Sequence, residues 1–200
     1  MSTPPPEFRV FDHTERYYLA LGQFIDKFAQ VEKMLALTLW IRSKVTPDVA
    51  RAVFSGVRAD GATGYITRVL TVTNADQATK DEYQSIFTQI GLINAARNSI
   101  VHYGTEFNDT GEYVTSNRFV ALTIDRLKET PVSADILYAM TLDLEKILMH
   151  LIRALAQTAT SVEPEWLEKM VGPYVNAPWR YTPPPQASQR DKSPAKLPKP

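Results

Sequence analysis

The chain has no cysteine among its 200 residues, which excludes disulfide bonds and thiolate metal sites and fits a cytoplasmic location. It also lacks any run of about eighteen consecutive apolar residues, the length that a membrane-spanning helix needs. Residues 1–6 show neither the basic start nor the apolar core of a secretory signal. We therefore expect a cytoplasmic protein that makes no contact with a membrane.

The chain has no excess of charge of one sign, because 22 basic side chains balance 22 acidic ones. The last fifteen residues carry a net charge of +3, so the preceding 185 carry −3. This balance excludes a general attraction to nucleic acid, and any contact with RNA must depend on a local site. The sequence also lacks a phosphate-binding glycine loop, a cluster of metal-ligand residues and a Ser-His-Asp arrangement. We expect no cofactor and no metal.

Apolar side chains recur at steps of three and four residues over most of the chain, which predicts amphipathic helices. The predicted helices cover 14–43, 47 to about 57, 65–72, 80–104 and 133 to about 159. The β-branched residues of 65–72 leave a strand as the alternative there. Because such helices can bury their apolar stripes only against one another, we predict an all-α fold, a small antiparallel bundle of four to five helices.

Particular residues are expected to begin or end these helices. The hydroxyl of Thr14 is expected to cap the first helix, and Ser133 to open the last long one. Gly104 is expected to end the helix before it in a left-handed conformation. Three glycines are expected to interrupt the chain before the short third helix: Gly56, Gly61 and Gly64.

The rest of the chain divides into an N-terminal arm (1–13), an insertion (105–131), a strap segment (161–182) and a tail (183–200). The turn residues Asn108–Gly111 predict a β-hairpin in the insertion, with 113–115 and 119–124 as its strands. Repeated prolines, beginning at Pro173, are expected to prevent regular structure, and the proline- and lysine-rich tail to be disordered. Four aromatic residues are expected to anchor the strap on the bundle: Trp166, Tyr174, Trp179 and Tyr181.

The segment Ala95–Gly104 gathers an arginine, an asparagine and a histidine near the end of an apolar helix. Arginine offers a fixed fork of donors that suits a phosphate, and histidine exchanges protons near neutral pH. Free carbonyls at the helix end favour the protonated form of His102, which suits a general acid. Arg97 and His102 differ by about 140° around an ideal helix, so the arginine must reach around to meet the histidine. The segment therefore predicts chemistry on a phosphodiester.

Arg97-Asn98, followed after three residues by His102, resembles the Arg-x4-6-His signature of the HEPN superfamily. The similarity extends over residues 14–160 and includes the segments 24–32 and 53–56 and the last long helix. It implies a helical domain that commonly dimerises and often acts as a metal-independent endoribonuclease in toxin-antitoxin, phage-defence or RNA-processing systems. Arg97 and His102 match the two signature positions, and Asn98 matches the polar residue that frequently follows the arginine. The insertion lies outside the shared pattern.

Metal-independent RNA cleavage needs one group to take the 2′-hydroxyl proton, one to protonate the leaving oxygen, and a cation for the developing charge. Arg97 can supply the cation, whereas one histidine can serve only one proton role at a time. We therefore predict a homodimer in which a second His102 completes the site, with 2′,3′-cyclic phosphate and 5′-hydroxyl products. Glu32 and Tyr103 are supporting candidates, as an orienting carboxylate and a substrate contact.

The same residues are also compatible with roles outside catalysis. Arg97 can pair with a carboxylate such as Glu32 and His102 can serve as a helix cap, while Tyr103 can pack under the hairpin. A non-catalytic HEPN-like module could bind a protein such as an antitoxin, an RNA or a nucleotide. A purely structural bundle could dock its tail, including 194–198, on another protein.

Overall fold

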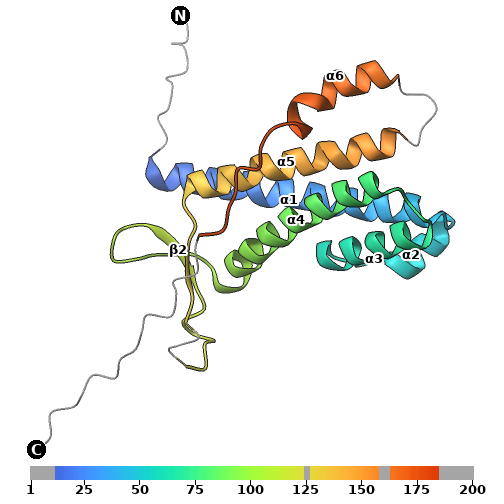
Figure 1. Ribbon diagram of the computed structural model, residues 1–200. Helices are drawn as coiled ribbons and strands as arrows, with labels where there is room; N and C mark the ends of the chain where they lie inside the picture. The colour runs from blue at the N-terminus through green and yellow to red at the C-terminus, as the bar shows by residue number, and fades with distance from the viewer. Residues whose placement is uncertain (1–11, 124–126, 158–162, 185–200) are drawn as a thin grey trace, which may run out of the picture.

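The computed structural model of the chain describes residues 12–123, 127–157 and 163–184. Within them it contains six helices and one small sheet, which confirms the predicted helical bundle with an insertion before its last long helix (Figure 1). The helices are α1 (His13–Ser43), α2 (Pro47–Phe54), α3 (Ala59–Val72), α4 (Gln77–Tyr103), α5 (Ala134–Ala156) and α6 (Pro164–Val175). No helix of these residues has the length and apolar content that a bilayer crossing requires.

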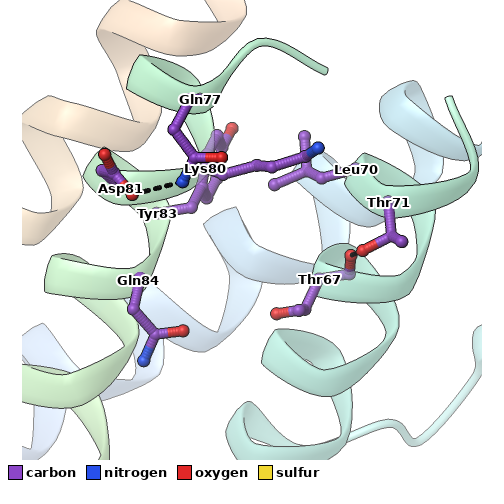
Figure 2. A pocket seen from close by; sticks show the side chains of 8 residues that line it. All are labelled: Thr67, Leu70, Thr71, Gln77, Lys80, Asp81, Tyr83 and Gln84. Carbon is purple, nitrogen blue, oxygen red and sulfur yellow. Dashed lines mark hydrogen bonds between the residues drawn. The ribbon is translucent and has the colours of Figure 1, made fainter. Parts of the chain in front are cut away.

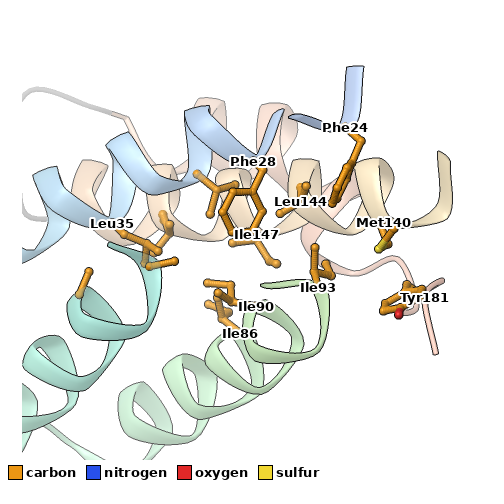
Figure 3. Close-up of a cluster of buried hydrophobic side chains, with 14 of the residues drawn as sticks. Phe24, Phe28, Leu35, Ile86, Ile90, Ile93, Met140, Leu144, Ile147 and Tyr181 are labelled. Atoms are coloured by element: carbon orange, nitrogen blue, oxygen red, sulfur yellow. The ribbon is translucent and has the colours of Figure 1, made fainter. Parts of the chain in front are cut away.

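The helices enclose one apolar core. α1 packs most extensively against α5 and next against α3, while α6 lies on the outer side of α5 (Figure 1). The core side chains come from α1, α3, α4 and α5, with further residues from the sheet region and the strap (Figure 3). They include Phe24, Phe28 and Leu35 of α1, Ile86, Ile90 and Ile93 of α4, and Met140, Leu144 and Ile147 of α5. The helical period thus identified most of the buried residues, but Leu92 and Val101, which share the predicted stripe of α4, are 36% and 52% exposed.

Several helix ends differ from the prediction. Asp12, not Thr14, caps α1: its carboxylate accepts from the Glu15 N–H at 2.8 Å, and the Glu15 side chain accepts from the Asp12 N–H at 3.2 Å. This reciprocal capping box satisfies donors that a single hydroxyl would leave free. Ser133 caps α5 as expected, accepting from the Ile136 N–H. α2 ends at Phe54, three residues before the predicted boundary.

Three predicted interruptions are also wrong. Gly61 and Gly64 lie inside α3, because packing of the α3 apolar face outweighs the low helix propensity of glycine. Since α3 continues to Val72, the strand alternative for 65–72 is also wrong. Pro173 lies inside α6, which continues to Val175. Disorder was predicted for residues 185–200, which lie outside the described residues. The N-terminal arm up to residue 11 and the predicted last turn of α5 after residue 157 also lie outside them.

The insertion contains a β-hairpin at the predicted turn, and a third strand extends it to a three-stranded antiparallel sheet. Its strands are β1 (Glu106–Phe107), β2 (Tyr113–Ser116) and β3 (Glu129–Pro131), in the order β1-β2-β3. The predicted turn joins β1 to β2, with Phe107 paired to Tyr113. The predicted strand over 119–124 is wrong: 119–123 form a loop with Phe119 91% exposed, and residue 124 is not described. Asn117 closes this loop by accepting from the Lys128 N–H at 2.7 Å, so β3 takes the place beside β2.

The strap crosses α5 after α6 and runs toward the sheet (Figure 1). Tyr181 is buried in the core and Trp179 packs against it, as predicted for anchors. Trp166, 57% exposed, and Tyr174 are exposed on α6 and anchor nothing in this way. Backbone groups of the strap also bond to α5, which the aromatic pattern could not reveal.

Candidate functional site

The end of α4 carries the predicted site. α4 ends at Tyr103, so His102 lies in the final turn as predicted. The Gly104 N–H donates to the Ile100 carbonyl at 2.9 Å, with φ +70° and ψ −167°. The positive φ explains the need for glycine, but ψ is extended rather than left-handed helical, so the expected type of helix stop is wrong. This conformation leads the chain directly into β1.

The sheet packs against the helix that bears the motif. The hydroxyl of Thr115 on β2 donates to the Ser99 carbonyl at 3.0 Å. Ser99 lies between Arg97 and His102 on α4, so this bond fixes the sheet beside the last two turns. The insertion therefore borders the candidate site.

Arg97 is half-buried and held by two neighbours. Its guanidinium carbon lies 5.4 Å from the centre of the Phe28 ring, and Nη1 donates to Oδ1 of Asn98 at 3.0 Å. Residues 12–123, 127–157 and 163–184 provide no ion pair for it. A partly desolvated guanidinium without a carboxylate retains its full attraction for an anion.

Glu32, the predicted orienting carboxylate, bonds to the start of α3 and not to Arg97 or His102. Its carboxylate accepts from the Ala59 N–H at 3.3 Å, and Ala59 is the first residue of α3. The carboxylate thus satisfies a free donor at the start of a helix. Nothing in the described part of the chain joins Glu32 to Arg97 or His102, so the structure supports neither the predicted orienting role nor the alternative ion pair.

His102 and Tyr103 both project into solvent at the end of α4. Tyr103 is 46% exposed, so the alternative that packs it under the hairpin is wrong. No hydrogen bond or ring contact among the described residues links His102 to Arg97. One copy of the chain therefore brings Arg97 and Asn98 together and leaves His102 free to meet another group.

Sequence reasoning missed an ionic cluster between α4 and α5. Glu82 Oε1 lies 2.7 Å from Nδ1 of His150 and 2.6 Å from Nη2 of Arg153. The hydrogen bond from His150 lowers the pKa of Glu82 to about 2; desolvation opposes this and Arg153 reinforces it. His150 and Arg153 are three residues apart on one helix face, but nothing in the sequence indicates that Glu82 faces them.

This cluster gives a pH prediction. Because folding lowers the pKa of Glu82 from 4.5 to about 2, its contribution is complete above about pH 5 and is lost as the pH falls through 2. After discounting for its one-third exposure, we expect wild type to lose about 1–2 kcal/mol more than Glu82→Gln between those values. Urea unfolding at several pH values measures how the free energy of unfolding of wild type and of Glu82→Gln changes with pH. An equal change in the two proteins would contradict the prediction.

A second missed network holds the strap. Asp143, 1% exposed on α5, accepts from the Arg180 and Tyr181 N–H groups, both at 2.8 Å, and from Gln89 Nε2 at 2.7 Å. Gln89 Nε2 also donates to the Tyr181 carbonyl at 2.9 Å. The only signal in the sequence was an acidic residue within the apolar stripe of the last long helix. Asp143, Gln89 and the strap backbone use their hydrogen-bonding groups on one another, so we assign them a structural role.

Comparison of the chain with protein-family models, with curated proteins and with solved structures finds no match. In the described ranges no three His, Asp or Glu side chains are grouped so that they could hold a metal ion. The side chains at the end of α4 therefore carry the inference about function.

Proposed function

We propose that this protein is a HEPN-like, metal-independent endoribonuclease that acts as a homodimer. The observation that supports this proposal is the state of Arg97: a half-buried guanidinium, oriented by Phe28 and Asn98, that no carboxylate of the described residues neutralises. Its charge is therefore available to a phosphate.

The proposed reaction is an in-line displacement at phosphorus. The 2′-oxygen of the RNA attacks the adjacent phosphorus as a base removes its proton, and the bond to the 5′-oxygen breaks as an acid protonates that oxygen. The products are a 2′,3′-cyclic phosphate and a 5′-hydroxyl. Arg97 stabilises the negative charge that develops on the phosphoryl oxygens. His102 serves as acid in one copy and as base in the other.

The second copy supplies what one chain lacks. His150 is engaged by Glu82 and the ring of His13 stacks on Tyr113; no hydrogen bond or ring contact among the described residues joins either histidine to His102. Val101 and Tyr103 expose apolar surface on either side of His102. Apolar surface around a catalytic group suits contact with another copy across a two-fold axis.

The test is cleavage of a labelled structured RNA in EDTA, with the mass of each preparation measured alongside. We expect dimeric wild type to cleave and a folded, dimeric His102→Ala variant to lose at least about 10²-fold in rate. His13→Ala is the matched control, since it removes the other exposed histidine and should cleave as wild type does. A fully active monomer, or equal cleavage by His102→Ala, would refute the proposal. Absence of cleavage by wild type across several RNAs would favour the non-catalytic binding module.

A further inference from the structure

The two ends of α4 differ in the side chains that surround them. Beside its N-terminal half, the pocket between α3 and α4 is lined mainly by polar groups, and Asp81 there accepts from Gln77 Nε2 at 2.7 Å (Figure 2). Beside its C-terminal end, the exposed side chains of Val101, Tyr103 and Phe107 are aliphatic or aromatic. Because grouped, exposed apolar side chains mark a contact surface, the C-terminal end is where we expect a partner.

The loop that follows β2, residues 117–123, carries the two most exposed large apolar side chains of the described residues. Phe119 is 91% exposed and Leu122 is 84% exposed, with Val120 also exposed between them. A turn orders this loop, because the Asn117 carbonyl accepts from the N–H groups of Val120 and Ala121, at 2.9 Å each. The loop thus presents its apolar side chains to solvent on a defined backbone. Their burial against a second molecule would be favourable.

Two neighbouring parts of the insertion carry opposite charge. The hairpin of β1, its turn and β2 (residues 105–116) contains three acids and no base: Glu106, Asp109 and Glu112. The described residues of the following segment (117–123 and 127–128) contain two bases and no acid: Arg118 and Lys128. Arg118 is used within the chain, since it pairs with Glu106 at 3.2 Å and with Glu129 at 3.3 Å. Lys128, Asp109 and Glu112 are exposed and have no ion pair among the described residues, so their charges remain for a partner.

A second copy of the chain offers the surface that complements both parts. Across a two-fold axis, one surface of a copy contacts a different surface of its partner, and the reverse contact occurs on the other side of the axis. The apolar, basic loop and the acidic hairpin can therefore meet twice in one dimer. Figure 1 shows the insertion at the end of the bundle at which α4 ends, and the bond from Thr115 to Ser99 holds it beside the last two turns. Contact between two insertions thus places both His102 side chains beside one interface.

We propose that this protein dimerises through its insertion. Phe119 and Leu122 of one copy pack on the hairpin of the other, beside the exposed ring of Phe107, and Lys128 pairs with the acids of that hairpin, Asp109 and Glu112. The inference rests on the proposed function, because the nuclease site is incomplete until a second His102 joins it. The interface itself can be tested without RNA, so the two proposals can fail separately.

Sedimentation of the full chain over a range of concentrations tests the apolar contact. We expect wild type to be a dimer and the double variant Phe119→Ser/Leu122→Ser to raise the Kd of the dimer at least about 100-fold, because the buried apolar anchors are lost. Both side chains are exposed in the single chain, so the melting temperature of the monomer should not fall. Trp166→Ser/Met170→Ser is the matched control, since it removes two exposed apolar side chains from α6 and should leave the Kd unchanged.

A charge exchange tests the pairing of loop and hairpin. Lys128→Glu alone and Asp109→Lys/Glu112→Lys alone should each raise the Kd of the homodimer at least about tenfold, because like charges then meet at both contacts. An equimolar mixture of the two variants should form heterodimers with nearly the wild-type Kd, since each copy again meets the opposite charge on its partner. A variant that weakened the dimer by damaging its own fold would not be rescued by mixing.

The interface is overturned if wild type stays monomeric at high micromolar concentration, if the loop variant dimerises as wild type does, or if the α6 control abolishes the dimer. A monomeric wild type that binds vesicles of anionic lipid through Phe119 and Leu122 would assign the loop to a membrane instead. RNA cleavage by the same preparations separates the two proposals. A monomeric loop variant with full cleavage keeps the interface and refutes the shared nuclease site. A loop variant that stays dimeric while cleavage depends on His102 keeps the nuclease and refutes the interface.

Discussion

Replacement of Asp143 with alanine is expected to lower the free energy of unfolding by about 3–5 kcal/mol, the largest stability effect that we expect from one side chain of this protein. The carboxylate is buried and accepts three hydrogen bonds, two from the strap backbone and one from Gln89. Removing it leaves the N–H groups of residues 180 and 181, which hold the strap on the bundle, without their acceptor, and takes one of the two hydrogen bonds of Gln89 Nε2.

Urea unfolding of Asp143→Ala measures this loss, and the fluorescence of Trp179, with Trp40 and Trp166 replaced by phenylalanine in both proteins, reports whether the strap separates before the bundle unfolds. Asp135→Ala is the matched control: Asp135 lies on the same helix but is exposed and pairs at the surface with Arg16, so it should cost at most about 1 kcal/mol. If the two variants lose equal stability, the buried carboxylate does not fix the strap.

The helical part of the fold could be predicted because it depends on local periodicity. The stripes that include Phe28, Ile90 and Leu144 are buried as the three- and four-residue spacing requires. Predictions based on a single residue type were weaker. Glycine and proline lie inside α3 and α6, where packing of the apolar face outweighs their low propensity. The apolar residues after Asn117 predicted a strand, but β2 pairs with residues 129–131, for which no local pattern predicts a strand.

The candidate site could be predicted only as far as one helix determines it. The sequence placed Arg97, Asn98 and His102 on the last two turns of α4, and the structure has them there. The partners of these and other polar groups come from distant segments: Glu32 meets a donor 27 residues away, and Asp143 meets donors 37 and 38 residues away. Such pairings follow from the packing of whole helices, so a single sequence does not reveal them.

Replacement of Arg97 with glutamine is expected to lower the rate of RNA cleavage by about 10²–10³-fold, if the proposed nuclease function is correct. Glutamine keeps a polar side chain that can bond to Asn98 but removes the charge that would stabilise the phosphoryl oxygens. Because Arg97 is half-buried and has no ion-pair partner among the described residues, we expect the free energy of unfolding to change by at most about 1 kcal/mol. Arg97→Lys keeps the charge and loses the planar fork, so it should retain about a tenth of the activity.

Single-turnover cleavage and urea unfolding of the same preparations separate the two roles that Arg97 could have. Arg51→Gln is the control, because Arg51 is an exposed arginine whose partner, Asp48, lies on the same short helix. If Arg97→Gln cleaves RNA as wild type does but loses several kcal/mol of stability, the guanidinium serves the packing of α4 on Phe28. If stability is unchanged and the rate falls, the charge acts on the substrate. A rate that falls while RNA affinity stays constant places that action in the transition state, because a contact used only for binding would weaken affinity instead.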